Sequence, residues 1–294
     1  MEWLSCIRKT IDFMESHLHD EISVQDVSDA VNVSQMFLQK GFSIMTGYGI
    51  GEYLRNRRLY EAAIDLISTD DKIIDIAYSY MYETPESFTK AFSRFHRASP
   101  SQIRSKEAPI KTFLPLRINI SISGGYIMDY RVLSKAGLKV IGFEKSFSMD
   151  TCNEEIPKFW DEMFETYAKN VVMGGEPVTP HEKAIVDCNI GEYGICIDDE
   201  QGSMRYLIAG DYHGGEIPEG MSLFEFPEGD WAIFDCYGPM PKAIQNITDR
   251  IFNEWLPGNP DYELAGNASV EWYEGTNKLD PDYHSAVWIP VRKK

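Results

Sequence analysis

The sequence of 294 residues is short of positive charge. It has 28 Lys and Arg against 46 Asp and Glu, which gives a net charge of −18 at pH 7. An acidic chain is poorly suited to non-specific nucleic-acid binding, because counterion release rewards local positive charge. Most of the acidic excess lies after residue 107. That part is suited to attracting a cationic ligand, although an acidic surface that only keeps a protein soluble is the more common case.

Cysteine is also scarce, and the usual signatures of catalysis are missing. The five cysteines are scattered and form no CxxC pair, which argues against a disulfide framework or a zinc knuckle. His181 and His213 stand apart from cysteine and from each other, and no HExxH, Walker loop, GxGxxG or GxSxG occurs. The sequence therefore predicts no metal site, no cofactor, no catalytic residue and no enzyme.

Long hydrophobic runs are absent as well. No stretch of about 18 apolar residues occurs, so no transmembrane helix is expected. The first residues, MEWLSCIRKTIDF, lack the apolar core of a signal peptide. The sequence predicts a cytoplasmic protein with no membrane association, and its length suffices for two globular domains.

Residues 73–104 have the pattern of two helices joined by a tight turn. Apolar residues follow helical spacing in the first helix: Ile73, Ile74, Ile76, Ala77 and Tyr80. Thr84 is a good N-cap and Pro85 suits the first helical position, so a second helix begins there. The outward face of this helix is polar and basic: Glu86, Ser87, Lys90 and Arg94. The pattern fits a helix-turn-helix that reads a major groove about as well as an ordinary helical hairpin.

A weaker copy of this pattern comes earlier in the chain. Ser23 caps a short helix, with Asp26 placed to complete a capping box, and residues 32–33 make the turn. Ser34 caps the next helix, which ends at Gly47. The residues expected to face outward are Gln35, Met36, Gln39 and Lys40.

One continuous helix, residues 51–68, joins the two copies. A rigid helix can hold two DNA-reading helices at the separation of successive major-groove faces, about 34 Å. Arg55, Arg57 and Arg58 lie close together on it. They are suited to reach phosphates, and equally to lie on a solvated helix face.

The second part of the sequence follows a different pattern after a junction at residues 108–127. The expected elements are a strand at 138–147, a helix at 154–170, strands at 192–197 and 204–210, then a strand at 231–237, a helix at 241–256, and strands at 264–273 and 286–291. Residues 117–128 also alternate like a strand. This order predicts an α+β domain of two strand-helix-strand-strand repeats with a groove between them.

The segment IAYSYMYETPESFTKAFSRFHRASPSQIR resembles the second helix-turn-helix of the AraC/XylS family of transcription regulators. The resemblance covers residues 1–107 and implies an all-α DNA-binding domain with two helix-turn-helix units. It implies base contacts by Met36, Gln39 and Lys40 in the first recognition helix and by Glu86, Ser87 and Lys90 in the second. Gln35, Arg55, Arg58 and Arg94 complete the predicted DNA-binding set. Glutamine is suited to adenine edges and lysine to guanine.

Two positions depart from that family. Met81 stands in the turn where the family usually has glycine, and Arg97 stands where a glycine commonly precedes the Ser-Pro pair. A side chain at a position that favours a glycine conformation strains the corner or changes its angle.

The blocks IPKFW, YGICIDD, WAIFDCYGPMP, IFNEWLP, VEWY and WIPV resemble the GyrI-like effector-binding domain, here residues 128–294. Such domains bind small, often cationic or lipophilic molecules in the cleft between their repeats. The resemblance implies that Glu271 meets the cation. The other residues expected around the cleft are Phe147, Trp160, Tyr193, Tyr206, Trp231 and Tyr273.

The chemistry of these residues agrees with that role. A carboxylate can offset a ligand's positive charge while aromatic faces add cation–π attraction. Because a buried, unpaired carboxylate is costly, we expect Glu271 to have a partner when no ligand is bound. A glutamate held in a salt bridge at a strand edge is the alternative, and each aromatic residue taken alone is more often simple core.

Together these features predict a ligand-responsive, sequence-specific DNA-binding transcription regulator. Its expected partners are double-stranded promoter DNA, a small-molecule effector and RNA polymerase. The alternative is a small-molecule-sequestering or hydrolytic GyrI-like protein with weakened DNA binding, in which Tyr193 or Cys196 would act beside Glu271.

Overall fold

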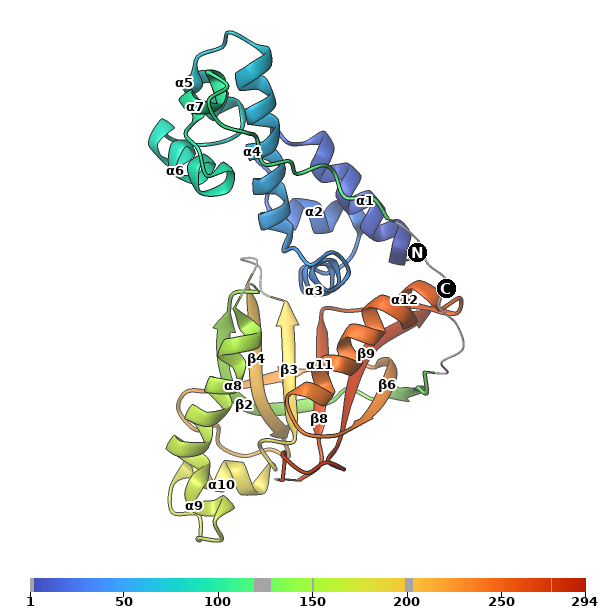
Figure 1. The fold of residues 1–294 in the computed structure, drawn as a ribbon. Helices are drawn as coiled ribbons and strands as arrows, with labels where there is room; N and C mark the ends of the chain where they lie inside the picture. Colours follow the sequence, from blue (N-terminus) through green and yellow to red (C-terminus); the bar gives the residue numbers. More distant parts are fainter. Residues whose placement is uncertain (1–2, 119–127, 150, 199–202, 276) are drawn as a thin grey trace. The chain divides into compact units, whose positions relative to one another are not determined.

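A computed structural model describes residues 3–118, 128–149, 151–198, 203–275 and 277–294 (Figure 1). The chain forms two compact units. The helical unit comprises Leu4–Asn32 and Thr46–Ser123, and the sheet unit comprises Met1–Trp3, Val33–Met45 and Gly124–Lys294. The helix α3, Gln35–Thr46, therefore lies almost wholly in the sheet unit, although its sequence belongs to the first helix-turn-helix.

The helices expected from the sequence are present. They are α1 Trp3–Ser16, α2 Val24–Val31, α4 Ile50–Ser68, α5 Ile73–Ser79 and α6 Pro85–His96, followed by a short α7, Pro100–Arg104. The predicted capping box of α2 is formed: the Ser23 hydroxyl accepts from the Asp26 N–H, and the Asp26 carboxylate accepts from the Ser23 N–H. Thr84 caps α6 by accepting from the Ser87 N–H at 3.1 Å.

The second helix-turn-helix is built on the long helix α4. Its core joins α4 to α5, α6 and α7 through buried apolar side chains: Leu59, Ala62, Ala63, Leu66, Ile76, Ala77, Tyr80, Phe88, Phe92, Phe95, Ala98 and Ile103. Since α5 and α6 bury their apolar faces against one helix, the polar face of α6 is left exposed.

Both residues that replace an expected glycine adopt a left-handed backbone. Met81 in the turn between α5 and α6 has φ 64°, and Arg97 at the end of α6 has φ 61°. Side chains with a Cβ pay a steric penalty in this region. The corner therefore keeps the geometry that glycine would give it, at a cost in stability.

Within the residues that the structure describes, the sheet unit contains one antiparallel sheet of nine strands. They are β1 Arg131–Lys135, β2 Lys139–Phe147, β3 Tyr193–Asp198, β4 Met204–Asp211, β5 Met221–Glu225, β6 Gly229–Tyr237, β7 Tyr262–Leu264, β8 Ala268–Tyr273 and β9 His284–Lys293. The order is β1-β6-β9-β8-β3-β4-β2-β5, and β7 pairs with β9. The predicted repeats are confirmed, because β6-β9-β8 in one half corresponds to β2-β4-β3 in the other, and β8 pairs with β3 at the centre.

Each repeat carries its helix on the same face of the sheet. Helix α8, Cys152–Met163, continues through the π-helical segment η1, Phe164–Ala168, and through α9, Lys169–Val172; α10, Pro180–Asp187, follows separately. In the second repeat, α11, Lys242–Arg250, continues through the π-helical segment η2, Ile251–Trp255, and through α12, Leu256–Gly258. Helix α8 packs against β2, and α11 packs against β6 and β9 (Figure 1). A π-helical turn thus follows the main helix of each repeat.

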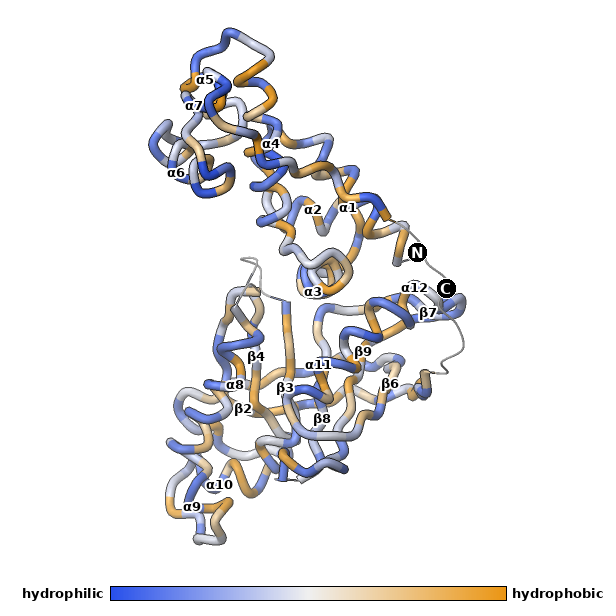
Figure 2. Tube along the Cα trace, viewed as in Figure 1, coloured by the Kyte–Doolittle hydropathy of each residue, from blue (hydrophilic) through white to orange (hydrophobic). Residues whose placement is uncertain are grey.

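The opposite face of the sheet carries an apolar cluster that includes Ile195, Leu207, Val270 and Trp288. Figure 2 shows hydrophobic residues along the central strands β3 and β4. Strands β1, β5 and β7 were not predicted from the sequence. Most of the strand expected over residues 117–128 lies outside the described residues.

Candidate functional site

The carboxylate of Glu271 on β8 has two phenol partners. Tyr206 on β4 and Tyr273 on β8 donate hydrogen bonds to its Oε2 atom, at 2.9 and 2.8 Å. The Tyr206 hydroxyl in turn accepts from the Trp160 indole N–H at 3.1 Å. Glu271 thus has hydrogen-bond partners within the protein, and both are phenols.

Burial keeps both phenols protonated. It raises the pKa of Tyr206 well above its usual value, and the Glu271 charge raises it further. The pKa of Tyr273 is raised for the same reasons in the same order. Both residues therefore remain hydrogen-bond donors near neutral pH.

Gly194 on β3 makes room for this arrangement. It pairs with Glu271 across the two central strands. A Cβ at residue 194 would overlap the Tyr206 hydroxyl and lie 3.0 Å from the Glu271 Oε2 atom. The absence of a side chain at this position thus allows the phenol and the carboxylate to meet.

Two cavities adjoin this group, and both are lined by Trp160, Tyr273 and Lys278. One of about 330 Å³ extends toward η1 and residues 189–192. The other, about 250 Å³, includes Glu271 and residues of both α8 and α11. The groove predicted between the repeats is therefore present, and its volume suits a small organic ligand.

Lys278, which the sequence analysis did not identify, occupies the aromatic part of the groove. Its Nζ lies 3.4 Å from the centroid of the Trp160 ring and 4.5 Å from that of Tyr273. Burial lowers the pKa of this lysine to about 8, although Glu271 attracts its charge. No periodic pattern in the sequence around residue 278 points to the groove, because the residue lies in a loop between β8 and β9.

The predicted cleft residues separate into two groups. Glu271, Trp160, Tyr206 and Tyr273 come together, and the Phe147 ring packs 6.5 Å from the Tyr206 ring. Two assignments are corrected: Tyr193 and Trp231 lie in the apolar cluster on the opposite face of the sheet. The alternation of a strand sends Gly194 toward Glu271, so Tyr193 must point away.

The same geometry bears on the hydrolytic alternative. Tyr193 is on the wrong face to act beside Glu271. Burial raises the pKa of the Cys196 thiol to about 12, and Glu271 raises it too, so the thiol stays protonated. A protonated thiol is a poor nucleophile.

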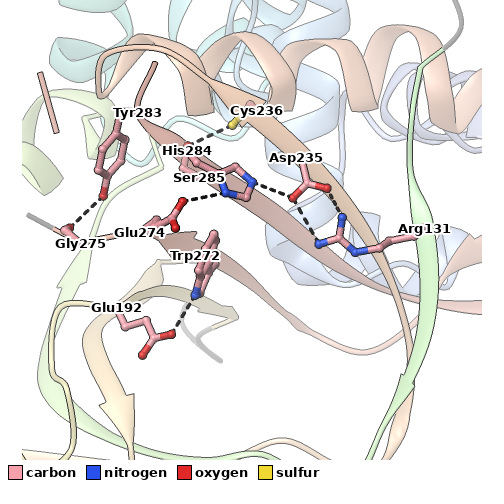
Figure 3. A network of polar contacts seen from close by, with 10 residues as sticks. All are labelled: Arg131, Glu192, Asp235, Cys236, Trp272, Glu274, Gly275, Tyr283, His284 and Ser285. Atoms are coloured by element: carbon pink, nitrogen blue, oxygen red, sulfur yellow. Dashed lines mark hydrogen bonds and ion pairs between the residues drawn. The ribbon is translucent and has the colours of Figure 1, made fainter. Parts of the chain in front are cut away.

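A polar network links strands β6, β8 and β9 on the face of the sheet opposite Glu271 (Figure 3). His284 on β9 contacts Glu274 at 2.9 Å through Nδ1 and Asp235 at 3.0 Å through Nε2. Burial raises the pKa of Asp235, but hydrogen bonds from Arg131 and His284 outweigh it, and the pKa is lowered. The Trp272 indole donates to Glu192 at 2.9 Å, which anchors β8 beside Glu271.

The predicted DNA-reading face of α6 is exposed. Glu86, Ser87, Lys90 and Arg94 all lie on the surface of the helical unit. Arg55 on α4 and Arg94 line one hollow of about 240 Å³ together with Lys111. The structure thus gathers three cations beside this face, although their contact with DNA remains a prediction.

The neighbouring arginines of α4 serve the fold instead. Arg57 is buried and forms ion pairs with Glu15 at 2.8 Å and Glu61 at 2.6 Å. Arg58 donates to the main-chain carbonyls of Leu18 and Asp20 near the end of α1. The expectation that these two reach phosphates is corrected, because their guanidinium groups are already engaged.

The outward orientation expected for the first recognition helix is wrong for two residues. Gln35 is 4% exposed and Met36 is 1% exposed. The cause is the Asp198 carboxylate at the end of β3, which accepts hydrogen bonds from the Ser34 side chain and from the main-chain N–H groups of Gln35 and Met36. Burial raises the pKa of Asp198 although these hydrogen bonds lower it. The hydrogen bonds tie the first turn of α3 to the end of β3, and a carboxylate at a helix N-terminus also suits the helix dipole.

Apolar contacts reinforce this position of α3. The Phe37 ring lies 6.4 Å from the Phe252 ring of η2, and Trp3 lies 5.7 Å from Phe252. Gly41 has the Trp3 and Phe252 side chains where a Cβ would be. Helix α3 therefore fits closely against the second repeat of the sheet unit.

Lys40 on α3 interacts electrostatically with Glu271. Burial lowers the pKa of its ammonium group, but the coulombic contributions of Cys196 and Glu271 raise it, and the pKa is raised overall. Gln39 is partly exposed. Of the three residues predicted to read bases from this helix, Met36 is buried, whereas Gln39 is partly exposed and Lys40 interacts electrostatically with Glu271.

The described residues contain no group of three or more His, Cys, Asp or Glu arranged to hold a metal ion. Within the same residues, no helix is both long and apolar enough to cross a membrane.

Comparison with known proteins identifies both parts of the chain. Residues 133–291 match the family described as integron-associated effector binding protein, and residues 27–106 match a helix-turn-helix domain. The right origin-binding protein of Escherichia coli K12 is 27% identical over 259 residues, which is 87% of this chain and 86% of that protein. The uncharacterized HTH-type transcriptional regulator YbfP of Bacillus subtilis is 36% identical over 105 residues, 36% of each chain.

Among solved structures, the integron cassette protein of Vibrio cholerae matches part of this chain. It is 16% identical, has a TM-score of 0.40, and aligns with 55% of this chain and 95% of its own.

Proposed function

The chain belongs to the family of integron-associated effector binding proteins, and we propose that it is a transcription regulator whose DNA binding responds to a bulky lipophilic cation. It joins the effector-binding domain to a helix-turn-helix domain of the AraC type.

One observation carries the choice of ligand: a partly buried carboxylate, Glu271, held by two neutral phenols at the mouth of an aromatic groove. The phenols satisfy hydrogen bonds without neutralising the charge. The negative charge therefore remains available to attract a cation, and the faces of Trp160 and Tyr273 add to the attraction. A neutral ligand would make use of the apolar walls only.

The experiment compares two probes of similar shape. Tetraphenylphosphonium carries a permanent positive charge, whereas triphenylphosphine oxide carries aromatic rings and no net charge. We expect Glu271→Gln to weaken binding of tetraphenylphosphonium, measured by calorimetry, about 10-fold to 100-fold, because 1.4 kcal/mol corresponds to tenfold. Binding of triphenylphosphine oxide should change little. Equal loss for both probes would show that Glu271 does not act through its charge.

We propose that the exposed face of α6 binds DNA through Lys90 and Arg94, with Glu86 and Ser87 beside them. Arg55 on α4 would add a contact to a phosphate. Helix α3 would contribute Gln35, Met36, Gln39 and Lys40 only after leaving Asp198. Ligand binding can regulate DNA binding only if the ligand has different affinities for these two arrangements. Contact with RNA polymerase would follow from a role in transcription.

A further inference from the structure

The loop residue Lys278 holds a positive charge where the proposed ligand would place its own. Its Nζ lies 3.4 Å from the Trp160 ring centroid and 4.5 Å from that of Tyr273. These distances are within the range of strong cation–π contacts. Glu271 attracts the same ammonium group electrostatically. The site thus contains an internal cation of its own.

We propose that Lys278 is a built-in competitor of the effector, which must displace the lysine ammonium group from Trp160 and Tyr273 in order to bind. This inference rests on the proposed function, since it concerns the same carboxylate and the same aromatic rings. It assigns Lys278 as a residue that sets which cations can enter.

The position of Lys278 also divides the groove. The cavities of about 330 and 250 Å³ both border its side chain, together with Trp160 and Tyr273. When the side chain leaves, the two cavities join into one that can hold a drug-sized molecule. A ligand with several aromatic groups would gain apolar contacts in both parts, whereas a small ammonium ion would only replace one cation by another. The lysine therefore selects bulky lipophilic cations against small ones.

Displacement requires no movement of the main chain. The carbonyl of Lys278 accepts a hydrogen bond from the Met240 N–H at 2.8 Å, which fixes the backbone at this residue. The four methylene groups of a lysine side chain rotate readily, and the freed ammonium group regains its hydration.

The competition depends on pH, because only the charged form of Lys278 competes fully. The pKa of Lys278 is about 8, so the fraction of neutral amine grows as the pH rises from 7 to 9. Other groups with shifted pKa values near Glu271 keep one state over this interval. The pKa values of Tyr206 and Tyr273 lie well above 10, that of Cys196 is about 12, burial raises that of Cys152, and that of Lys40 is raised above 10.5. The carboxyl groups that line the groove are Asp161, Glu192 and Glu271, and Asp249 acts electrostatically on Lys40.

The first measurement needs no ligand. In protein labelled with ¹³C at the lysine Cε atoms, the signal missing from Lys278→Met belongs to Lys278. We expect ring currents to shift its attached protons upfield, and we expect it to titrate near pH 8. A signal at the frequency of a solvated lysine that titrates near 10.5 would overturn the proposal, whatever the protein binds.

The second measurement is the affinity for tetraphenylphosphonium by calorimetry between pH 7 and 9. We expect Lys278→Met to bind about tenfold more tightly than wild type at pH 7, the scale of a lost cation–π competitor. The wild-type affinity should rise with pH, whereas that of Lys278→Met should stay flat. Lys278→Arg, which remains charged, should bind weakly at every pH. Tetramethylammonium should bind weakly to all three proteins.

The outcomes separate the two proposals. If wild type binds tetraphenylphosphonium in a manner that depends on Glu271, but Lys278→Met binds no more tightly, the competitor role is refuted and the proposed function stands. If neither wild type nor Lys278→Met binds the cation, the proposed function fails, and the role of Lys278 fails with it.

Discussion

Gly194 shows how much of the site depends on a single missing side chain. The Tyr206 hydroxyl and the Glu271 carboxylate occupy the space that a Cβ at this position would take. The phenol and the carboxylate define both the charge and the shape of the groove. Gly194 has no side chain to line the groove, yet it determines both the charge and the shape of the groove.

We expect Gly194→Ala to weaken binding of tetraphenylphosphonium by about tenfold or more, because it separates Tyr206 from Glu271 and leaves the carboxylate without one donor. Gly229→Ala in β6 is the matched control, since a Cβ there meets nothing within 4 Å. Calorimetry on both variants checks the effect. Unchanged affinity in Gly194→Ala would mean that the groove tolerates the loss of this contact.

Met81 illustrates a different cost at a single residue. Its φ of 64° lies in the left-handed region, where a residue with a Cβ is disfavoured. We expect Met81→Gly to raise the stability of the helical unit by about 1 kcal/mol, measured by chemical denaturation. Thr89→Gly, in the middle of the exposed face of α6, should lower it. A loss of stability in Met81→Gly would show that the Met81 side chain contributes more than its backbone costs.

At the scale of elements, the helix α3 is the most informative part of the chain. Its sequence has the spacing of a recognition helix, yet Gln35 and Met36 are buried. Local pattern could not reveal this, because the partner that holds α3 is Asp198, 162 residues away from Met36 along the chain. In the observed position of α3, the side chains of Gln35 and Met36 are buried and cannot reach bases.

We therefore expect Asp198→Asn to increase DNA affinity in the absence of ligand, because the amide keeps the shape of the carboxylate and removes the charge that favours the α3 N-terminus. Lys90→Gln on α6 serves as the comparison. It should weaken DNA binding and reduce the slope of log affinity against log salt by about 1. Gel shifts over a range of salt concentrations measure both. Equal DNA affinity of Asp198→Asn and wild type would argue against a blocked α3.

The strands show where prediction from the sequence succeeds and where it stops. Alternation and the VEWY block placed Glu271 and Tyr273 together, since residues two apart on a strand share a face. The same reasoning failed for Tyr193, because only the pairing of Gly194 with Glu271 decides which face of β3 meets the groove. Lys278 could not be found at all, because a loop residue has no periodicity.

At the scale of the whole molecule, the order of domains and of the two repeats could be predicted from the sequence, because hydrophobic spacing and capping residues are local signals. Arg57 and Arg58 mark the limit of that approach. Both read as surface cations, and only tertiary structure shows that one is buried between Glu15 and Glu61 and the other holds main-chain carbonyls. Long-range contacts decide the role of such residues.

Lys40 suggests how effector binding reaches the DNA-binding function. Its ammonium group is attracted to Glu271, the same carboxylate that the ligand would use. A bound cation would neutralise the charge of Glu271 and so weaken the attraction between Glu271 and Lys40 of α3. Since coupling between sites is reciprocal, DNA that binds α3 should in turn tighten ligand binding.

The most direct test is the affinity for DNA from upstream of the protein's own gene, measured by fluorescence anisotropy with and without saturating tetraphenylphosphonium. We predict that the cation tightens DNA binding of the wild-type protein at least about fivefold, the lower end of typical coupling between sites, and has no effect on Glu271→Gln. If DNA affinity of the wild type is the same with and without the bound cation, the effector site and the DNA-binding helices are not coupled, and the account is contradicted.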